Sequence, residues 1–287
     1  VGTGVFLKAR VMTCNVGSPG AVIAVWVVAA LLSLAGALTY AELAAARPRA
    51  GGEYVYIKDA YGRLAGFLYG WTRFFVASTG AMAGLATGFA IFVNILAGGA
   101  LDSRGALVAL PWAGLSISAL QGVAIGAILL VTAINCTPVK AGGGVALVLT
   151  IFKIGLLLAI GAGAMALGGG SWDHFAMSGA GGSCEGVAAA ARGGVAGFGA
   201  AMIGALWAYN GWNEVTFVAE EVKNPRTTLP LALVGGMAVI AGLYVLVNTA
   251  YFFVLTPDEV ASVPIASSVA TAVAERALGP RPAALMA

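Results

Sequence analysis

The sequence predicts an all-α membrane protein, and its composition, its charge-free windows and the placement of its basic residues support this. Of the 287 residues, 60% are hydrophobic and 9% are charged, and the mean hydropathy is +0.94. A soluble domain carries about 25% charged residues because its surface must hold water. The composition therefore argues against a soluble enzyme. The net charge of +3 is too small and too dispersed to indicate a nucleic-acid partner.

Each predicted membrane helix lies in a long window with little or no charge. A helix needs about 20 apolar residues to cross a hydrocarbon core roughly 30 Å thick. Residues 11–41, 74–101, 105–139, 193–213 and 227–257 carry no charge, and 141–172 carry only Lys153. Because backbone groups in lipid must be satisfied within their own segment, we expect these windows to be helical. The predicted elements are a half-helix at 1–13, full spans near 19–44, 66–96, 115–136, 142–168, 194–221 and 228–254, and a last span that begins near 282.

Local chemistry supports these helices. Pro19 suits a first helical turn, where a missing N–H costs nothing. The many glycines and alanines inside the spans allow helices to approach closely in lipid. The sequence has no initiator Met and opens inside an apolar run, which suggests a fragment.

Basic residues predict the orientation in the membrane. Alternate connections hold eight of the fifteen Lys and Arg, and the positive-inside tendency places these connections in the cytoplasm. The eight are Arg47, Arg49, Lys58, Arg63, Arg73, Lys140, Lys223 and Arg226. The longer connections 97–114, 169–193 and 255–281 are expected outside, although Lys8 and Arg10 also fall on that side and count against the rule.

Two segments interrupt the helical pattern, Gly2–Phe6 and Trp207–Asn213. Glycine beside small or polar residues lowers the cost of unwinding a turn, which at membrane depth is tolerated only in a cavity or within protein. The N–H end of a half-helix favours a carboxylate and the carbonyl end favours an ammonium. Two facing breaks would therefore bind a zwitterion such as an α-amino acid. The alternative, close helix packing, suits a lone Gly-x-Gly better than a pair of breaks in two halves.

Other polar residues carry weaker indications. The three cysteines lack CxxC spacing, which supports neither a metal knuckle nor a disulfide framework, although Cys184 could pair with Cys14 outside. His174 is expected in a solvated outer loop, and a single histidine gives no nucleophile–His–acid arrangement. Interfacial ion pairs with Arg47 or Arg226 are the favoured roles of Glu42, Glu220 and Glu221. The glycine runs 142–144 and 168–170 lack the Lys-Ser/Thr of a phosphate loop.

Four stretches resemble amino acid permeases of the amino acid–polyamine–organocation superfamily, essentially end to end and in order. The family's first-helix break is matched by Gly2-Thr3-Gly4-Val5-Phe6, and its second-to-third helix loop by Tyr40-Ala41-Glu42-Leu43 with Pro48 and Gly51-Gly52-Glu53-Tyr54-Val55-Tyr56. The fourth and fifth helices are matched by Asn135, Val139-Lys140 and Lys153. The sixth helix is matched by Tyr209-Asn210-Gly211-Trp212-Asn213 with Ala219-Glu220-Glu221-Val222-Lys223-Asn224-Pro225 and Leu229-Pro230. The last stretch is most similar to the L-type branch of sodium-independent neutral amino acid exchangers.

The resemblance implies a broken-helix fold of two five-helix repeats with inverted topology (5+5), truncated here at both ends. Residues 1–287 would form one partial transmembrane domain. Residues 1–168 would be the first repeat, from most of helix 1 to helix 5. Residues 194–287 would start the second repeat, with helices 6 and 7 and the beginning of helix 8.

The resemblance also assigns roles at the two breaks. Gly2 allows the bend, while Thr3 and Gly4 present amides to the substrate carboxylate. The carbonyls of Trp207 and Asn210 match positions that receive the ammonium, and Trp207 also matches an aromatic gate over the substrate. The expected substrate-binding residues are Gly2, Thr3, Gly4, Trp207, Tyr209, Asn210, Gly211 and Asn213.

Lys153 is the most informative single charge. An ammonium in the middle of a membrane helix is costly and by default indicates function. In sodium-independent relatives a lysine at the matching position replaces a cation and braces the first helix. We therefore expect Lys153 to be a coupling or structural charge that removes the need for sodium.

Together these features predict a secondary transporter, not an enzyme, that moves neutral α-amino acids across the cell (plasma or inner) membrane by alternating access. Sodium-independent exchange and proton-coupled uptake both remain open, and no metal or cofactor is expected. A cationic amino acid or polyamine permease is the alternative, for which Glu214 is the one acidic candidate in the pocket. A non-transporting scaffold or channel would not explain two breaks and an intramembrane lysine. The family's outer-loop cysteine for an ancillary heavy chain has no counterpart in 97–114, so no such partner is expected.

Overall fold

Long apolar helices dominate the computed structural model, which describes residues 4–101, 105–110, 115–136, 139–178, 181–265 and 267–279. Within these residues, four helical stretches are long and apolar enough to cross a membrane: Pro19–Ala46, Arg63–Leu96, Gly143–Leu167 and Pro225–Val254. Ala119–Asn135 is a shorter apolar helix. The predicted all-α membrane fold is confirmed, with one small two-stranded sheet added in the described chain.

The first part of the chain follows the predicted spans closely. Helix α1 covers Gly4–Val16 and α2 covers Pro19–Ala46, where the Ser18 hydroxyl accepts a hydrogen bond from the Ala21 amide. A short helix α3 (Glu53–Tyr61) follows. The span expected near 66–96 is one long helix in three parts: α4 (Arg63–Thr72), the π-helical turn η1 (Arg73–Ser78) and α5 (Thr79–Leu96).

The expected outer connection at 97–114 holds a β-hairpin instead of a plain loop. Strand β1 (Ala106–Leu110) pairs antiparallel with β2 (Leu115–Ser118). The span expected near 115–136 therefore begins later, as α6 (Ala119–Asn135), because residues 115–118 belong to the strand. A capping box between Ser118 and Gln121 fixes this start. Helix α7 (Val139–Leu167) is the next span.

The second part of the chain contains the interrupted helix. After the short 3₁₀ turns η4 (Trp172–Ala176) and η5 (Ala189–Ala191), α8 (Gly194–Tyr209) leads into the 3₁₀ helix η6 (Trp212–Glu221). Helix α9 (Pro225–Val254) follows. The expected loop 255–281 contains two further helices, α10 (Pro257–Ser262) and α11 (Val269–Leu278). The span predicted near residue 282 lies outside the described residues.

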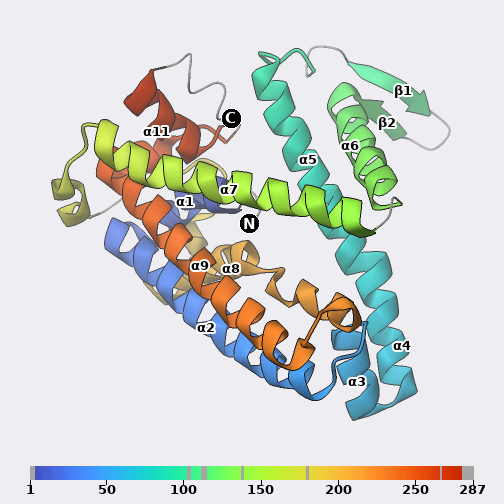
Figure 1. Cartoon of the computed structure of the whole chain (residues 1–287). Helices are drawn as coiled ribbons and strands as arrows, with labels where there is room; N and C mark the ends of the chain where they lie inside the picture. Colours follow the sequence, from blue (N-terminus) through green and yellow to red (C-terminus); the bar gives the residue numbers. More distant parts are fainter. Residues whose placement is uncertain are drawn as a thin grey trace.

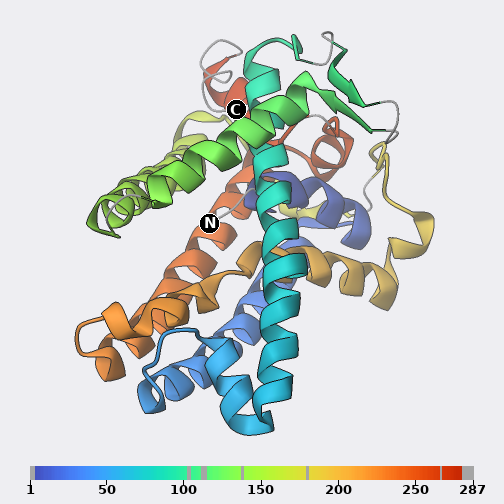
Figure 2. The same cartoon turned by 90° about the vertical axis from the view of Figure 1, so that its right-hand side faces the viewer.

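Two groups of helices make up the molecule. In the larger group, α2 and α9 lie side by side and α1, α7 and α8 pack around them, as Figure 1 shows. Three buried aromatic rings mark its centre, with Trp26 5.7 Å from Tyr209 and 5.2 Å from Tyr244 between ring centroids. In the smaller group, α6 packs on α5 through the buried alanines Ala86, Ala90 and Ala124. The long α4–η1–α5 helix runs the height of the molecule (Figure 2).

A disulfide fastens the end of α1 to the connection before α8. Cys14 and Cys184 are bonded, with 5.6 Å between their Cα atoms, so the pairing considered from the sequence is confirmed. Polar contacts surround the bond. The side-chain amide of Asn15 donates to the Ala191 carbonyl at 2.6 Å, and the backbone N–H of Gly193 donates to the backbone carbonyl of Asn15 at 2.7 Å. The end of the molecule that holds the disulfide lies opposite the end that holds α3, because α2 begins near the disulfide and ends near α3.

Candidate functional site

The predicted break in the second interrupted helix is present. Helix α8 ends at Tyr209, Asn210 is extended (φ −61°, ψ 147°), and Gly211 has φ 107°. A φ in this range costs glycine little but strains residues that carry a Cβ. Residues 210–211 therefore stop the helix, and the chain resumes as η6 in a different hydrogen-bonding pattern.

The start of α1 lies directly against this break. Gly2 and Thr3 lie outside the described residues, and α1 begins at Gly4. A Cβ built on Gly4 would lie 2.6 Å from the Cβ of Ala208 and 3.0 Å from its Cα. Only glycine permits this approach, so the first turn of α1 and the last turn of α8 adjoin. The two segments that were predicted to face one another are neighbours in space.

The helix ends at this junction present opposite partial charges. The first N–H groups of an α-helix and its last C=O groups lack partners within the helix. At the α8 end, the Ala208 carbonyl accepts a hydrogen bond from the Tyr244 hydroxyl at 3.1 Å, and the Trp207 carbonyl accepts from the Asn210 amide at 3.2 Å. A carbonyl has two lone pairs, so each of these oxygens keeps acceptor capacity. The junction can therefore receive an ammonium beside the positive end of α1.

Trp207 lies at the edge of the junction and is 51% exposed. The Lys8 ammonium, one turn into α1, lies 5.1 Å from the centroid of the Trp207 ring. Such a cation–π contact is worth about 0.5–1 kcal/mol at an exposed site. It links α1 to α8 on the side of the break that leads toward the disulfide end.

Tyr209 and Asn213 make other contacts. The Tyr209 side chain is 2% exposed, packs on Trp26 and Tyr244, and donates to the Trp26 carbonyl at 3.3 Å. Asn213 is 5% exposed, and its amide donates to the Glu53 carboxylate. Asn210 and Gly211 are exposed at the break. Of the predicted substrate-binding residues, the structure thus groups Gly4, Trp207, Asn210 and Gly211.

Glu53 has a larger role than the sequence indicated. Its carboxylate accepts hydrogen bonds from the Tyr40 and Tyr69 hydroxyls as well as from Asn213. The sequence offered one clue, a carboxylate within the glycine- and tyrosine-rich stretch 51–56. Nearby, burial raises the pKa of the Tyr56 phenol above its ordinary value of 10.0, and the charge of Glu53 adds to this effect. Tyr56 therefore stays protonated at neutral pH.

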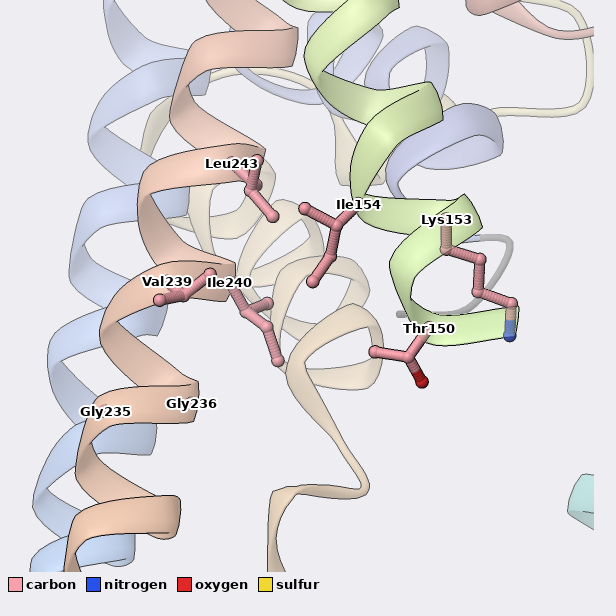
Figure 3. Close-up of a pocket in the computed structure, with 8 residues that line it drawn as sticks. All are labelled: Thr150, Lys153, Ile154, Gly235, Gly236, Val239, Ile240 and Leu243. Atoms are coloured by element: carbon pink, nitrogen blue, oxygen red, sulfur yellow. The ribbon is translucent and has the colours of Figure 1, made fainter. Parts of the chain in front are cut away.

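Lys153 is exposed on α7. It borders a cavity of about 310 Å³ between α7 and α9, together with Thr150, Ile154, Gly235, Gly236, Val239, Ile240 and Leu243. Figure 3 shows its ammonium on the side of α7 that faces away from α9. Among the described residues, Lys153 makes no hydrogen bond or ion pair.

The remaining polar candidates also find defined places. Glu214 forms an ion pair with Arg73, and Arg47 pairs with Asp59 rather than with the expected glutamates. Glu42 is exposed. His174 is partly buried, with its Nδ1 3.0 Å from the Phe252 carbonyl oxygen, so its side chain is less solvated than expected.

Comparison with known proteins points to one family. The amino acid permease family model matches residues 1–287. The mouse b(0,+)-type amino acid transporter 1 is 30% identical over 281 residues, which cover 98% of this chain and 53% of the relative. The serine/threonine exchanger SteT of Bacillus subtilis is 29% identical over 91% of this chain and 53% of its own length. The rabbit large neutral amino acids transporter small subunit 2 is 30% identical over 97% of this chain and 48% of its own. The chain thus spans about half the length of these relatives.

Proposed function

We propose a function from the premise that this chain belongs to the amino acid permease family. It is a multi-pass membrane protein, and it forms part of a secondary transporter that carries neutral α-amino acids by alternating access. The observation that carries this proposal is the junction of Gly4 on α1 with Ala208, beside the break at Asn210–Gly211. In transporters, the substrate site usually lies where helices are interrupted in the middle of the membrane.

In the proposed mechanism the substrate is bound mainly by backbone groups. Its carboxylate meets the N–H groups at the start of α1, where the helix dipole is positive, and the resemblance to the permease family assigns the donor roles to Thr3 and Gly4. Its ammonium meets the carbonyls of Trp207 and Asn210. The Trp207 ring covers the bound amino acid from the side of the disulfide end.

The charge near the junction favours a neutral substrate over a cationic one. The Lys8 ammonium lies over Trp207, and a second cation at this edge would be repelled. Glu214, the acidic candidate for a cationic amino acid or polyamine permease, is already paired with Arg73. Neutral amino acids therefore remain the first choice, and cationic amino acids and polyamines are the classes to test against them.

Transport is proposed to be independent of sodium. By the resemblance above, Lys153 occupies the place that a cation takes in sodium-coupled relatives. If replacing sodium with choline abolished uptake by the intact transporter, this role of Lys153 would be refuted. Exchange and proton coupling are separated by a second measurement, in which an internal amino acid accelerates uptake only by an exchanger.

The repeats and the orientation are part of the same proposal. Residues 1–168 would form the first repeat and 194–287 the start of an inverted second one. The α3 end would face the cytoplasm, because Arg47, Lys58 and Lys223 cluster in its connections. The disulfide at the opposite end supports this, since disulfides persist in oxidising compartments outside the cytoplasm.

We expect no ancillary chain on the basis of the cysteines of this chain. The relatives do not support this expectation, because one of them is named a small subunit, a name that implies a partner chain. Of the three cysteines in the sequence, Cys14 and Cys184 are bonded to one another and Cys136 lies at the end of α6. The two bonded cysteines therefore offer no free thiol for a bond between chains. Migration of the native protein on non-reducing gels at the mass of one chain would agree, and a mass shift reversed by reductant would refute it.

The central experiment is uptake of radiolabelled amino acids into proteoliposomes that contain the intact transporter. Saturable uptake of one or more neutral amino acids, with competition among them, is the expected result. Uptake confined to lysine, arginine or polyamines would replace the substrate class. Flux that does not saturate would indicate a channel and refute the carrier mechanism.

A further inference from the structure

The Glu53 carboxylate is the polar centre of the α3 end. One of its oxygens accepts hydrogen bonds from the Tyr40 hydroxyl at 3.0 Å and from the Asn213 amide, and the other accepts from the Tyr69 hydroxyl. The three donors belong to three different elements, α2, η6 and α4. Among the described residues Glu53 has no ion-pair partner, so its polar contacts are these hydrogen bonds.

The segment after the break is docked closely beside Glu53. The Gly51 amide donates to the Phe217 carbonyl at 3.1 Å. A Cβ on Gly52, which has φ 50°, would lie 2.6 Å from the Thr216 hydroxyl oxygen. Thr216 itself is 0% exposed, and the Tyr40 and Trp212 ring centroids are 5.0 Å apart. The start of η6 therefore has little room to move while these contacts hold.

A second connection joins η6 to the long helix. Arg73, the first residue of the π-helical turn η1, pairs with Glu214 and lies 5.5 Å from the centroid of the Phe217 ring. These residues border a cavity of about 360 Å³ together with Tyr54, Tyr69 and Phe74. Because the Glu214 side chain is largely exposed, this ion pair alone would hold η6 weakly.

We propose that Glu53 is a positioning residue of the transport cycle, which latches η6 to the α3–α4 hairpin and keeps the α3 end closed. The latch consists of Glu53, Tyr69 and Asn213, with the Arg73–Glu214 pair beside it. This inference rests on the proposed function, because a latch on the segment after the break controls access to the substrate site. Opening of the α3 end requires Asn213 to leave Glu53, and η6 then moves away from α3 and α4.

The choice of a carboxylate fits this role. Hydrogen bonds to an ionised acceptor are about twice as strong as those between neutral groups. One carboxylate can accept from all three donors at once, whereas an amide in its place would present an N–H group to at least one of them. Glu53→Gln therefore changes little in volume but weakens every bond of the latch together.

Thiol labelling tests the latch without any substrate. In the intact transporter with Cys136→Ser, Thr216→Cys places a thiol at a position that the closed latch buries completely. The rate of its reaction with a membrane-impermeant maleimide, applied at the α3 end, measures opening. Glu53→Gln is expected to raise this rate at least about tenfold, since hydrogen bonds to a charged group are the stronger class.

Three further variants separate the latch from general loosening. Tyr69→Phe removes one hydroxyl donor and should also raise the rate, while the double variant with Glu53→Gln should react no faster than Glu53→Gln alone. Glu42→Gln is the matched control, because Glu42 is exposed near the same end and makes no hydrogen bond or ion pair within the described chain. Its labelling rate should equal that of the parent.

The outcome is decisive in each direction. Equal labelling of Glu53→Gln and Glu42→Gln, or strictly additive effects of Glu53→Gln and Tyr69→Phe, would overturn the latch. If Glu53→Gln does not fold, as judged by its melting curve, Tyr69→Phe alone decides by the same comparison. A parent that labels as expected but transports no amino acid would refute the proposed function and leave the latch standing.

Discussion

The contact between α1 and α8 predicts that Gly4→Ala will weaken substrate binding strongly. The added Cβ would lie 2.6 Å from the Cβ of Ala208. Carbon atoms pack comfortably at about 3.5–4.0 Å, so α1 must withdraw from α8 by about 1 Å. The amide of residue 4 is retained, so the change tests the geometry of the junction rather than the number of donors.

The expected magnitude follows from this displacement. Overpacking of a tight contact costs about 1–3 kcal/mol, and a shift of 1 Å in positioned groups can cost about 100-fold in rate. We therefore expect KM for a neutral amino acid such as leucine to rise by about ten- to a hundredfold. The assay is initial uptake into proteoliposomes over a range of leucine concentrations, normalised to the amount of folded protein.

Gly199→Ala is the matched control. Gly199 lies on α8, and a Cβ built there would have no atom within 4 Å. This variant should keep the KM of the parent. If Gly4→Ala and Gly199→Ala gave the same KM and the same maximal rate, the junction would not be the substrate site.

Three other predictions concern charge selectivity, the disulfide and pH. Lys8→Gln should raise uptake of lysine relative to leucine by about tenfold, because a unit charge a few ångströms away contributes about 1 kcal/mol or more; Lys58→Gln is the control, and an unchanged ratio would contradict the role of Lys8. Cys14→Ser should lower the melting temperature, because the disulfide with Cys184 closes a 170-residue separation and such bonds contribute about 2–4 kcal/mol; Cys136→Ser should have no effect, and equal melting temperatures for both would refute this. Although partial burial opposes it, hydrogen bonds from Thr256 and the charge of Arg276 hold the pKa of Glu259 below its ordinary value of 4.5. The stability that Glu259 adds is therefore present above pH 4.5 and is lost as the pH falls through its lowered pKa. The melting temperature of Glu259→Gln should depend less on pH in this range than that of the parent. An identical pH dependence of the two proteins would contradict the assignment.

The sequence was most informative where the membrane itself imposes the structure. Spans such as Pro19–Ala46 and Pro225–Val254 were found within a few residues, because lipid requires long apolar helices whatever their neighbours. The break at Asn210–Gly211 was also found, since a helix end in this position depends on the local freedom of glycine. Both features are determined by residues close together in the chain.

Features built from distant residues were harder to predict. The Asn213–Glu53 hydrogen bond joins residues 160 positions apart, and the glycine- and tyrosine-rich stretch around Glu53 does not reveal that distant partner. The hairpin at 106–118 and the helices α10 and α11 lie in connections where charge-free length, the main criterion for a span, says nothing about local structure. The resemblance predicts Tyr209 as a substrate-binding residue, but the direction of its side chain is set by packing against Trp26 and Tyr244.

The two ends of the molecule are held by bonds of different kinds, and this bears on how a carrier of this shape can move. At the disulfide end, a covalent bond and backbone hydrogen bonds fix α1 to the connection before α8, so α1 and α8 must move as one body. At the α3 end, η6 is held by side-chain hydrogen bonds, by the backbone hydrogen bond from Gly51 to Phe217 and by one exposed ion pair, none of which is covalent. In the proposed transport cycle, the disulfide end would therefore preserve the junction of Gly4 with Ala208. The reversible fastening lies where the substrate would leave.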